Sequence, residues 1–215
     1  MHIDIFSDVI CPWCFIGKRR LSRALAAESG VAVTKRWRAF MLNPDMPPEG
    51  MDRQTYLALK FGGPGHAKRI YDNVLQAAET EGLALNLDKI VRTPSTVKAH
   101  RLIRWASDTG DADPVVEGLF RAYFMEGRNI GDPVELADIA GAAGFDAADA
   151  RAMLDGPDGE AEIAAEDRSA RRVGINGVPC FIFDGQYAVS GAQEPEVFAP
   201  LFAAARSNSL SPTAA

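Results

Sequence analysis

Cys11 and Cys14 are separated by Pro12 and Trp13, and the pair lies between a short apolar strand pattern and a helical pattern. This spacing lets the two thiols meet across the first turn of a helix, where a disulfide can form and open. A helix N-terminus carries partial positive charge and unpaired N–H groups, so it stabilises a thiolate, the form that attacks a disulfide. Pro12 suits the first helical position because its missing N–H would have no partner there. The motif predicts a redox-active dithiol.

A structural zinc site is the alternative for two cysteines at this spacing. Zinc would need two further ligands, and the chain offers only Cys180 and three histidines, His2, His66 and His100, which lie without ligand spacing. The strand–CxxC–helix context therefore favours redox chemistry, and we expect no metal site.

The residues around the pair predict a β-α-β unit. Apolar alternation indicates a strand over 3–6, helical spacing extends over about 12–28, and a second strand pattern covers 31–42. Basic residues interrupt the second strand, so we expect it at a sheet edge or with one solvated face. A β-α-β unit with CxxC at its first strand-to-helix junction is typical of the opening of a thioredoxin-like fold.

The middle of the chain has a different pattern. Residues 44–156 show repeated helical periodicity with almost no strand signal, and glycines and prolines separate the periodic stretches. Thr93 and Pro94 are expected to cap and begin one of these helices. This segment predicts a large all-helical insertion.

The last part of the chain predicts the second half of the fold. Helical residues 160–173 lead to a β-hairpin over 178–189 and to a last helix that ends near residue 205. We therefore predict an α/β protein with a thioredoxin-like fold and a large all-helical insertion. The expected division is 1–43 for the first thioredoxin-like half, 44–156 for the insertion, 157–206 for the second half, and 207–215 for a flexible tail.

Val178 and Pro179 stand at the start of the strand pattern that follows the insertion. Proline at the start of a central strand removes a ladder hydrogen bond, so its position needs a reason. In thioredoxin-like folds such a proline follows a cis peptide bond and lies against the CxxC pair, and the preceding residue offers its backbone to an extended substrate. We expect a cis Val178–Pro179 bond and a role for both residues in the site.

Cys180 follows Pro179 directly, and strand alternation should turn its side chain to the opposite face of the sheet. Free cysteine is among the most buried residue types. We therefore expect a packed core thiol; a resolving or regulatory thiol is the alternative.

The sequence identifies no proton acceptor for Cys14. Trp13 cannot supply an imidazolium partner to a thiolate, and Ile5 stands where many thioredoxin-like enzymes have an acid. Asp8 is expected to shape the turn before Cys11. Acid–base assistance is therefore expected from water or from a group elsewhere in the chain.

Composition excludes several classes of protein. The 215 residues are 47% hydrophobic and 24% charged, which is ordinary for a globular protein. The formal net charge of −6 and the lack of a basic stripe argue against nucleic-acid binding. We expect no membrane span and no signal peptide, because the strand pattern begins directly after Met1. Three cysteines fit a reducing compartment, so the expected location is the cytoplasm.

Taken together, the motifs resemble the DsbA-like thioredoxin family, in particular its cytoplasmic FrnE-like branch. The resemblance covers nearly the whole chain in order, and its matching segments are 6–18, 42–47, 99–102, 122–132, 174–179 and 189–193. The same superfamily contains kappa-class glutathione transferases and 2-hydroxychromene-2-carboxylate isomerases, which have Ser where Cys11 stands.

The resemblance implies a thiol–disulfide oxidoreductase or isomerase that acts on protein or small-molecule disulfides. It implies no bound cofactor, with glutathione as a candidate redox partner. We expect Cys11 to be the nucleophile, Cys14 the resolving thiol and Pro179 the third member of the catalytic site. The expected substrate-binding residues are Pro12, Trp13, Val178, Ser190, Gly191 and Gln193.

Two other functions remain open at this stage. A glutathione-dependent transferase or isomerase would bind glutathione near Val178 and the turn over 190–193. A non-enzymatic chaperone or binding module would use the helical insertion as a lid over apolar clients. Either a monomer or a homodimer is compatible with the sequence.

Overall fold

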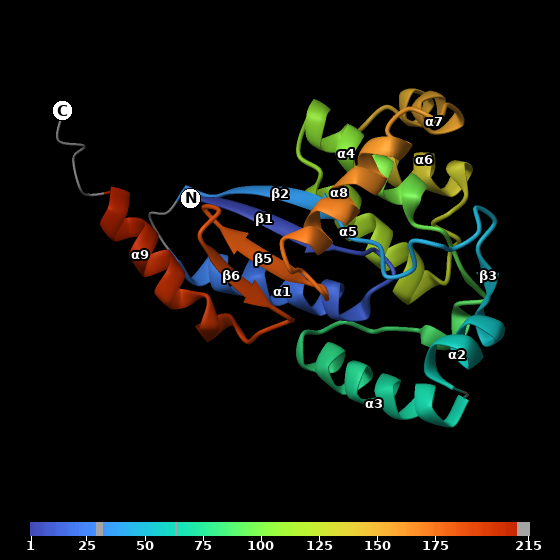
Figure 1. The fold of residues 1–215 in the computed structure, drawn as a ribbon, viewed down its shortest axis with the longest axis horizontal. Helices are drawn as coiled ribbons and strands as arrows, with labels where there is room; N and C mark the ends of the chain where they lie inside the picture. Colours follow the sequence, from blue (N-terminus) through green and yellow to red (C-terminus); the bar gives the residue numbers. More distant parts are fainter. Residues whose placement is uncertain (29–31, 63, 210–215) are drawn as a thin grey trace.

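A four-stranded mixed sheet lies at one end of the molecule (Figure 1). The computed structural model describes residues 1–28, 32–62 and 64–209. The strand order is β2-β1-β5-β6, and β2 runs parallel to β1 while β5 and β6 run antiparallel to their neighbours. The bounds are β1 (His2–Ser7), β2 (Thr34–Ala39), β5 (Cys180–Phe183) and β6 (Tyr187–Ser190). The sheet is that of a thioredoxin-like fold, as predicted.

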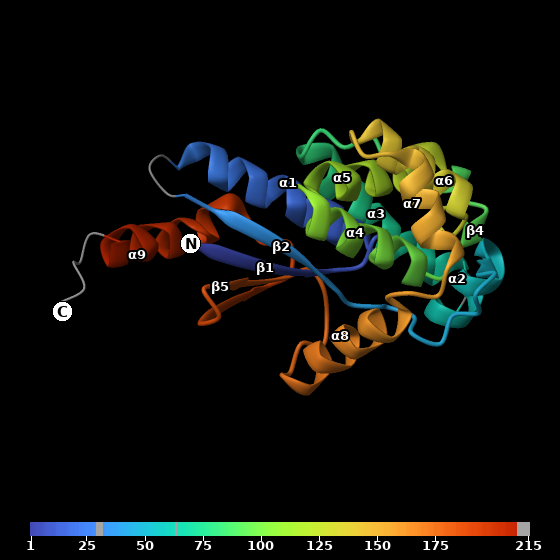
Figure 2. The same cartoon turned by 90° about the horizontal axis from the view of Figure 1, so that it is seen from above.

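Helices cover both faces of this sheet (Figure 2). One face carries α1 (Pro12–Ala27), and α8 (Glu160–Arg172) lies on the other. Strand alternation supplies a core to each side, because Ile3 and Ile5 belong to the cluster that includes α1, whereas Phe6 packs with Ala170 of α8. The C-terminal elements are η3 (Pro195–Val197) and α9 (Ala199–Ser209).

The insertion between β2 and α8 packs beside the sheet. Its longer helices are α2 (Arg53–Phe61), α3 (Pro64–Thr80), α4 (Val97–Thr109), α5 (Asp113–Arg121), α6 (Pro133–Ala142) and α7 (Ala147–Asp155). A 3-10 turn, η1 (Leu87–Lys89), and a π-helical turn, η2 (Ala122–Glu126), complete its helical elements in the described part of the chain. None of the described helices has the length and apolarity needed to cross a bilayer.

The insertion is not purely helical, which corrects the sequence expectation. Strand β3 (Met51–Asp52) pairs antiparallel with β4 (Arg92–Thr93). Thr93 is fully buried, and its carbonyl oxygen lies 2.6 Å from where a Cβ on Gly50 would stand, so only glycine fits beside the paired strands. Thr93 and Pro94 therefore do not begin a helix; Thr96 is the N-cap of α4.

Other boundaries also differ from the predicted ones. β2 begins at Thr34 and ends at Ala39, and it lies at the sheet edge as predicted; residue 31 falls outside the described residues. α9 continues to Ser209, so the expected tail cannot begin at 207. Phe202 of this helix is fully buried and packs edge-on against Phe183 of β5, which holds α9 on the sheet. Residues 210–215 of the expected tail lie outside the described residues.

Phe15 joins α1 to the insertion. Its ring is fully buried and stacks on Phe120, with centroids 5.0 Å apart, and on Phe124, with centroids 6.4 Å apart. All three rings belong to one hydrophobic cluster that also contains the sheet residues Ile3 and Ile5. The helix that begins at the CxxC pair therefore has its position fixed from both the sheet and the insertion.

We expect Phe15→Ala to lower the free energy of unfolding by about 3–5 kcal/mol, because it removes a buried ring and leaves a cavity among rigid neighbours. Urea denaturation followed by circular dichroism measures this change. Leu59→Ala is the control, since Leu59 is 73% exposed and its truncation should change stability by no more than about 0.5 kcal/mol. Equal losses in the two variants would contradict the role given to Phe15.

Candidate functional site

Cys11 is the N-cap residue of α1, and Pro12 takes the first helical position. The backbone of Cys11 is extended, and its N–H donates to the carbonyl oxygen of Asp8 at 3.0 Å. The N–H of Cys14 in turn donates to the carbonyl oxygen of Cys11 at 3.0 Å. The Cys11 thiol thus stands at the positive end of the helix, as the sequence predicted.

The peptide bond between Val178 and Pro179 is cis, as predicted. It brings the chain reversal before β5 against the start of α1, where the Cys11 thiol donates to the Val178 carbonyl oxygen at 3.6 Å. Pro179 is buried against Gly17, where an added Cβ would lie only 2.8 Å from the Pro179 Cγ. Residues more than 160 positions apart in the chain therefore form one site.

The turn over 190–193 lies beside the cis-proline. The Gly191 N–H donates to the Pro179 carbonyl oxygen at 2.8 Å, and the Gln193 side chain donates to the Ser190 carbonyl oxygen at 2.8 Å. Ser190 and Gln193 are exposed, whereas Pro12 and Trp13 are half-buried beside Cys11. The structure thus brings Pro12, Trp13, Val178 and Gly191 to the start of α1 and the cis-proline, whereas the Ser190 hydroxyl turns toward Cys180 on the opposite face of the sheet. The substrate-binding role of all the expected residues stays a prediction.

Arg20 of α1 holds this turn in place. Its guanidinium donates to the Ala192 carbonyl oxygen at 2.6 Å and pairs with Glu194 at 2.7 Å and Glu81 at 3.0 Å. The Arg20 side chain is only 10% exposed, so these bonds are largely shielded from water. Arg20 thereby connects α1, the turn directly after α3 and the turn that borders Pro179, a role that the sequence pattern did not indicate.

The two active-site thiols differ in burial. Cys14 is 1% exposed and Cys11 is 6% exposed, and both are free. Burial raises the pKa of Cys14 well above its usual value, and the neighbouring Cys11 thiol raises the pKa further. The Ser7 hydroxyl and the Asp8 backbone, which lie beside the Cys14 sulfur, partly lower the pKa again. Cys14 therefore keeps its proton until a partner removes it.

Cys180 lies on the opposite face of the sheet, in a cluster with Phe6, Phe40 and Ala170. It is 3% exposed, so the predicted burial is confirmed. Burial raises the pKa of the Cys180 thiol, while the Ser190 hydroxyl, which donates to its sulfur at 3.9 Å, lowers the pKa. The core thiol thus points away from the CxxC pair.

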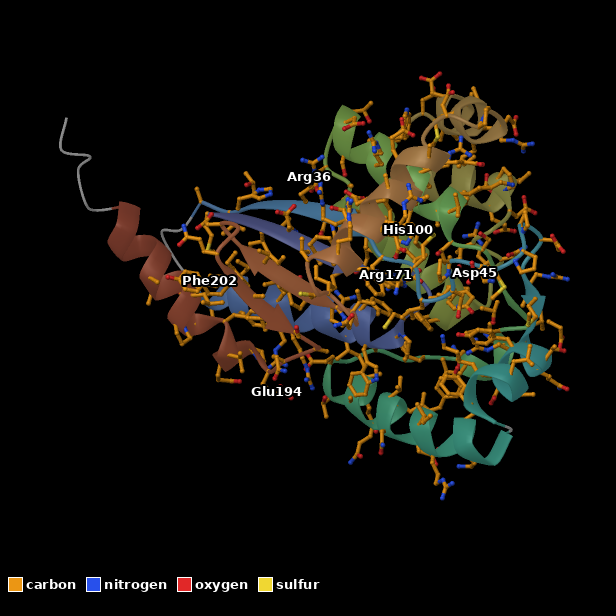
Figure 3. The ribbon with its side chains drawn as sticks, in the orientation of Figure 1. Arg36, Asp45, His100, Arg171, Glu194 and Phe202 are labelled. Atoms are coloured by element: carbon orange, nitrogen blue, oxygen red, sulfur yellow. The ribbon has the colours of Figure 1, made fainter. Side chains whose placement is uncertain are left out.

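A buried carboxylate–imidazole pair lies behind Cys14, and the sequence pattern did not identify it. Asp8 is fully buried; its Oδ2 accepts from the Leu42 N–H at 2.7 Å, and its Oδ1 lies 3.5 Å from Nε2 of His100. His100 projects from α4 toward the sheet (Figure 3). The only sequence feature that could have indicated a buried His100 is its place beside Leu102 and Ile103 on a helical segment with an apolar face.

Known proteins resemble the chain over its whole length. The DSBA-like thioredoxin domain matches residues 2–203. A probable DsbA oxidoreductase of Streptomyces coelicolor is 34% identical in sequence, with a TM-score of 0.86 over 100% of this chain and 93% of that chain.

Two other solved structures share the fold at lower identity. A 2-hydroxychromene-2-carboxylate isomerase is 16% identical, with a TM-score of 0.70 over 98% of this chain and 100% of that chain. The cytosolic disulfide reductase DsbM of Pseudomonas aeruginosa, solved with GSH, is 19% identical, with a TM-score of 0.65 over 96% of this chain and 100% of that chain. At these identities the likeness extends to the fold alone.

Alkylation should label Cys11 before Cys14. The raised pKa of Cys14 keeps its reactive thiolate scarce near neutral pH, so its labelling rate should be slow and should rise steeply as pH increases. Iodoacetamide labelling of the reduced protein between about pH 7 and 10, followed by peptide mass mapping, measures the order. Urea-unfolded protein is the control, and there the two thiols should react at similar rates. Faster labelling of Cys14 in the folded protein would reverse the assignment of the two thiols.

Cys180→Ala should keep disulfide-reductase turnover within a few-fold of the parent and lose about 1 kcal/mol of stability, because the thiol is a small packed group on the far face. Insulin-reductase assays of the variant and the parent, with peptide mapping of the oxidised parent, check this. A disulfide between Cys180 and Cys11 or Cys14 would contradict the packing role.

Proposed function

The chain belongs to the DSBA-like thioredoxin domain family, and on that basis we propose that it is a cytoplasmic thiol–disulfide oxidoreductase or isomerase. One observation carries the proposal: Cys11 is the N-cap residue of α1, and its thiol lies 3.6 Å from the carbonyl oxygen of Val178, directly before a cis-proline. A nucleophile at a helix N-terminus and an adjacent backbone acceptor are what thiol–disulfide exchange on an extended substrate requires.

In the proposed reaction, the Cys11 thiolate attacks one sulfur of a substrate disulfide. A bond forms between Cys11 and that sulfur, and the other substrate sulfur leaves as a thiolate. Cys14, once deprotonated, then attacks the Cys11 sulfur and releases the second substrate thiolate. The substrate gains two electrons, and the Cys11–Cys14 pair becomes a disulfide. Reversal of these steps would oxidise or rearrange a substrate.

The surroundings of Cys11 support an extended substrate. Val178 is half-buried, with its carbonyl directed at the thiol, and the turn that contains the exposed Gln193 is joined to Pro179 by the hydrogen bond from the Gly191 N–H. Main-chain hydrogen bonds to such a loop tolerate many side chains. The proposed substrates are therefore protein or small-molecule disulfides, without selection for one sequence.

The proposed location and partners follow from the state of the cysteines. Three free thiols are compatible with a reducing compartment, where a CxxC pair is catalytic and not structural. Glutathione is the proposed redox partner that would reduce the Cys11–Cys14 disulfide. No cofactor is needed for the proposed exchange, because both electrons come from the two cysteines.

A glutathione-dependent transferase or isomerase is the second candidate, favoured by the fold shared with 2-hydroxychromene-2-carboxylate isomerase. In such an enzyme the residue at position 11 would assist glutathione without forming a disulfide. A glutathione-conjugation assay of Cys11→Ser separates the two, because only the transferase would keep activity. A pure chaperone would still suppress aggregation with both Cys11 and Cys14 replaced by Ser.

Cys14→Ser should trap mixed disulfides on Cys11, because the nucleophile then has no resolving partner, and turnover of insulin disulfides should fall at least about a hundredfold. Cys11→Ser should form no mixed disulfide at all. Mass spectrometry of each variant after incubation with oxidised glutathione measures the adduct. Cys180→Ser is the matched control and should behave as the parent. Adducts on Cys14 in the Cys11→Ser protein would contradict the proposed roles.

A further inference from the structure

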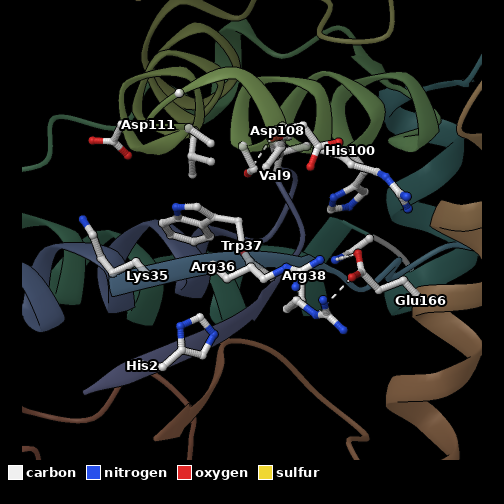
Figure 4. A pocket seen from close by; sticks show the side chains of 18 residues that line it. His2, Val9, Lys35, Arg36, Trp37, Arg38, His100, Asp108, Asp111 and Glu166 are labelled. Atoms are coloured by element: carbon white, nitrogen blue, oxygen red, sulfur yellow. Dashed lines mark hydrogen bonds and ion pairs between the residues drawn. The ribbon is translucent and has the colours of Figure 1, made fainter. Parts of the chain in front are cut away.

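A cavity of about 390 Å³ lies between β2 and α4 (Figure 4). Its lining reaches from exposed groups such as Arg36 and Arg104 down to Ser7, Val9 and His100, which are all less than 5% exposed. A space of this size holds several water molecules where polar groups line it. The cavity therefore joins buried polar groups at the end of β1 to the surface.

Two buried polar atoms at the inner end of this cavity are unsatisfied. Ser7 Oγ is buried without a hydrogen-bond partner, and it lies close enough to the Cys14 sulfur to lower the pKa of that thiol. His100 Nε2 likewise lacks a hydrogen bond, and its nearest partner is Asp8 Oδ1 at 3.5 Å. A buried polar atom without a partner is costly, so its retention calls for a reason.

Cys14 supplies that reason. The thiol must lose its proton to resolve a mixed disulfide, yet it is 1% exposed. Ile5 of β1 packs in the cluster that contains α1, at the position where many thioredoxin-like enzymes have an acid, and its apolar side chain cannot accept a proton. Among the described residues, Ser7 contacts the Cys14 sulfur and also lines the cavity where His100 lies.

We propose that Ser7 and the Asp8–His100 pair form the proton path of Cys14, with the cavity between β2 and α4 as its exit. The inference rests on the proposed function. Ser7 exchanges a proton with a reacting sulfur and is therefore a catalytic residue in this proposal, whereas His100 and Asp8 act through Ser7 and are positioning residues.

The protons and electrons balance as follows. The Cys14 proton passes to the Ser7 hydroxyl, which releases its own proton to water in the cavity and from there to His100. The Asp8 carboxylate stabilises the imidazolium that results. The electron pair left on the Cys14 sulfur forms the bond to Cys11, and the departing substrate thiolate takes up a proton from solvent. When the pair is reduced, the same path returns the proton.

Charged groups from several elements also line the cavity around the path. Arg38 lines the cavity and is neutralised by Glu166 of α8 at 3.0 Å. Outside the cavity, the Asp8 carboxylate contributes to the raised pKa of Tyr56 of α2, after burial as the main cause. The remaining charged or titratable cavity groups are His2, Lys35 and Arg36 from the sheet and Arg104, Asp108 and Asp111 from α4 and the residues after it. Opposite charges are therefore mixed along the exit.

The test separates the two chemical steps with oxidised glutathione as the probe. Formation of the Cys11 adduct is followed by mass spectrometry in the Cys14→Ser background. Resolution is followed as the release of glutathione in a single turnover of proteins that keep Cys14. The variants are Ser7→Ala and His100→Gln, and the matched controls are Ser107→Ala and His2→Gln. Both controls line the same cavity, but His2 stands at the opposite end of β1 from Ser7, and Ser107 lies about two turns along α4 from His100.

Both variants should form the Cys11 adduct at the parent rate but resolve it about tenfold more slowly near pH 7. The deficit should shrink as pH rises toward the raised pKa of Cys14, because hydroxide then removes the proton without the path. The two controls should match the parent in both steps.

Resolution rates that equal the parent rate in both variants at every pH would overturn the inference. A deficit of the same size at every pH would also overturn it, because that result indicates a displaced Cys14 and not a lost proton path. A parent protein that forms no Cys11 adduct would contradict the proposed function itself. The adduct measurement therefore distinguishes failure of the inference from failure of the function.

Discussion

The close contact between α1 and the cis-proline loop is the constraint on which the site depends. Gly17 allows it, because any larger residue would place a Cβ 2.8 Å from Pro179. Arg20 secures the same contact from one turn further along α1, through the Ala192 carbonyl oxygen. The close approach of α1 to the cis-proline loop also brings the Cys11 thiol to the Val178 carbonyl oxygen. The packing of the helix and the position of the proposed substrate-binding backbone therefore depend on the same contact.

Local features of the fold could be predicted from the sequence because their causes are local. The apolar alternation of β1, the proline after Cys11 and the basic residues of β2 each act within a few positions, and all three led to the observed element. The cis bond before Pro179 was predicted from the resemblance to a family and not from local preference, since most X–Pro bonds are trans.

Features that depend on contacts between distant segments could not be predicted. Thr93 has the chemistry of a helix cap, but pairing with Met51 draws it into β4. Asp8 looked like a turn residue, and its carbonyl does accept from Cys11; its carboxylate meets His100 only because α4 packs across β2. No periodicity in either segment encodes that approach, so the polar neighbourhood of Cys14 emerges from tertiary packing.

The stacking of Phe15 on two rings of the insertion bears on modularity. A thioredoxin-like unit trimmed of residues 44–156 would retain the CxxC sequence but would expose Phe15 and lose the α4 side of the buried Asp8–His100 contact. The insertion therefore does not behave as an accessory attached to a self-sufficient enzyme. It packs against α1 and against the residues that precede it. A CxxC motif transplanted without the insertion would therefore keep its sequence but lose the packing and the buried polar contact that surround the two cysteines.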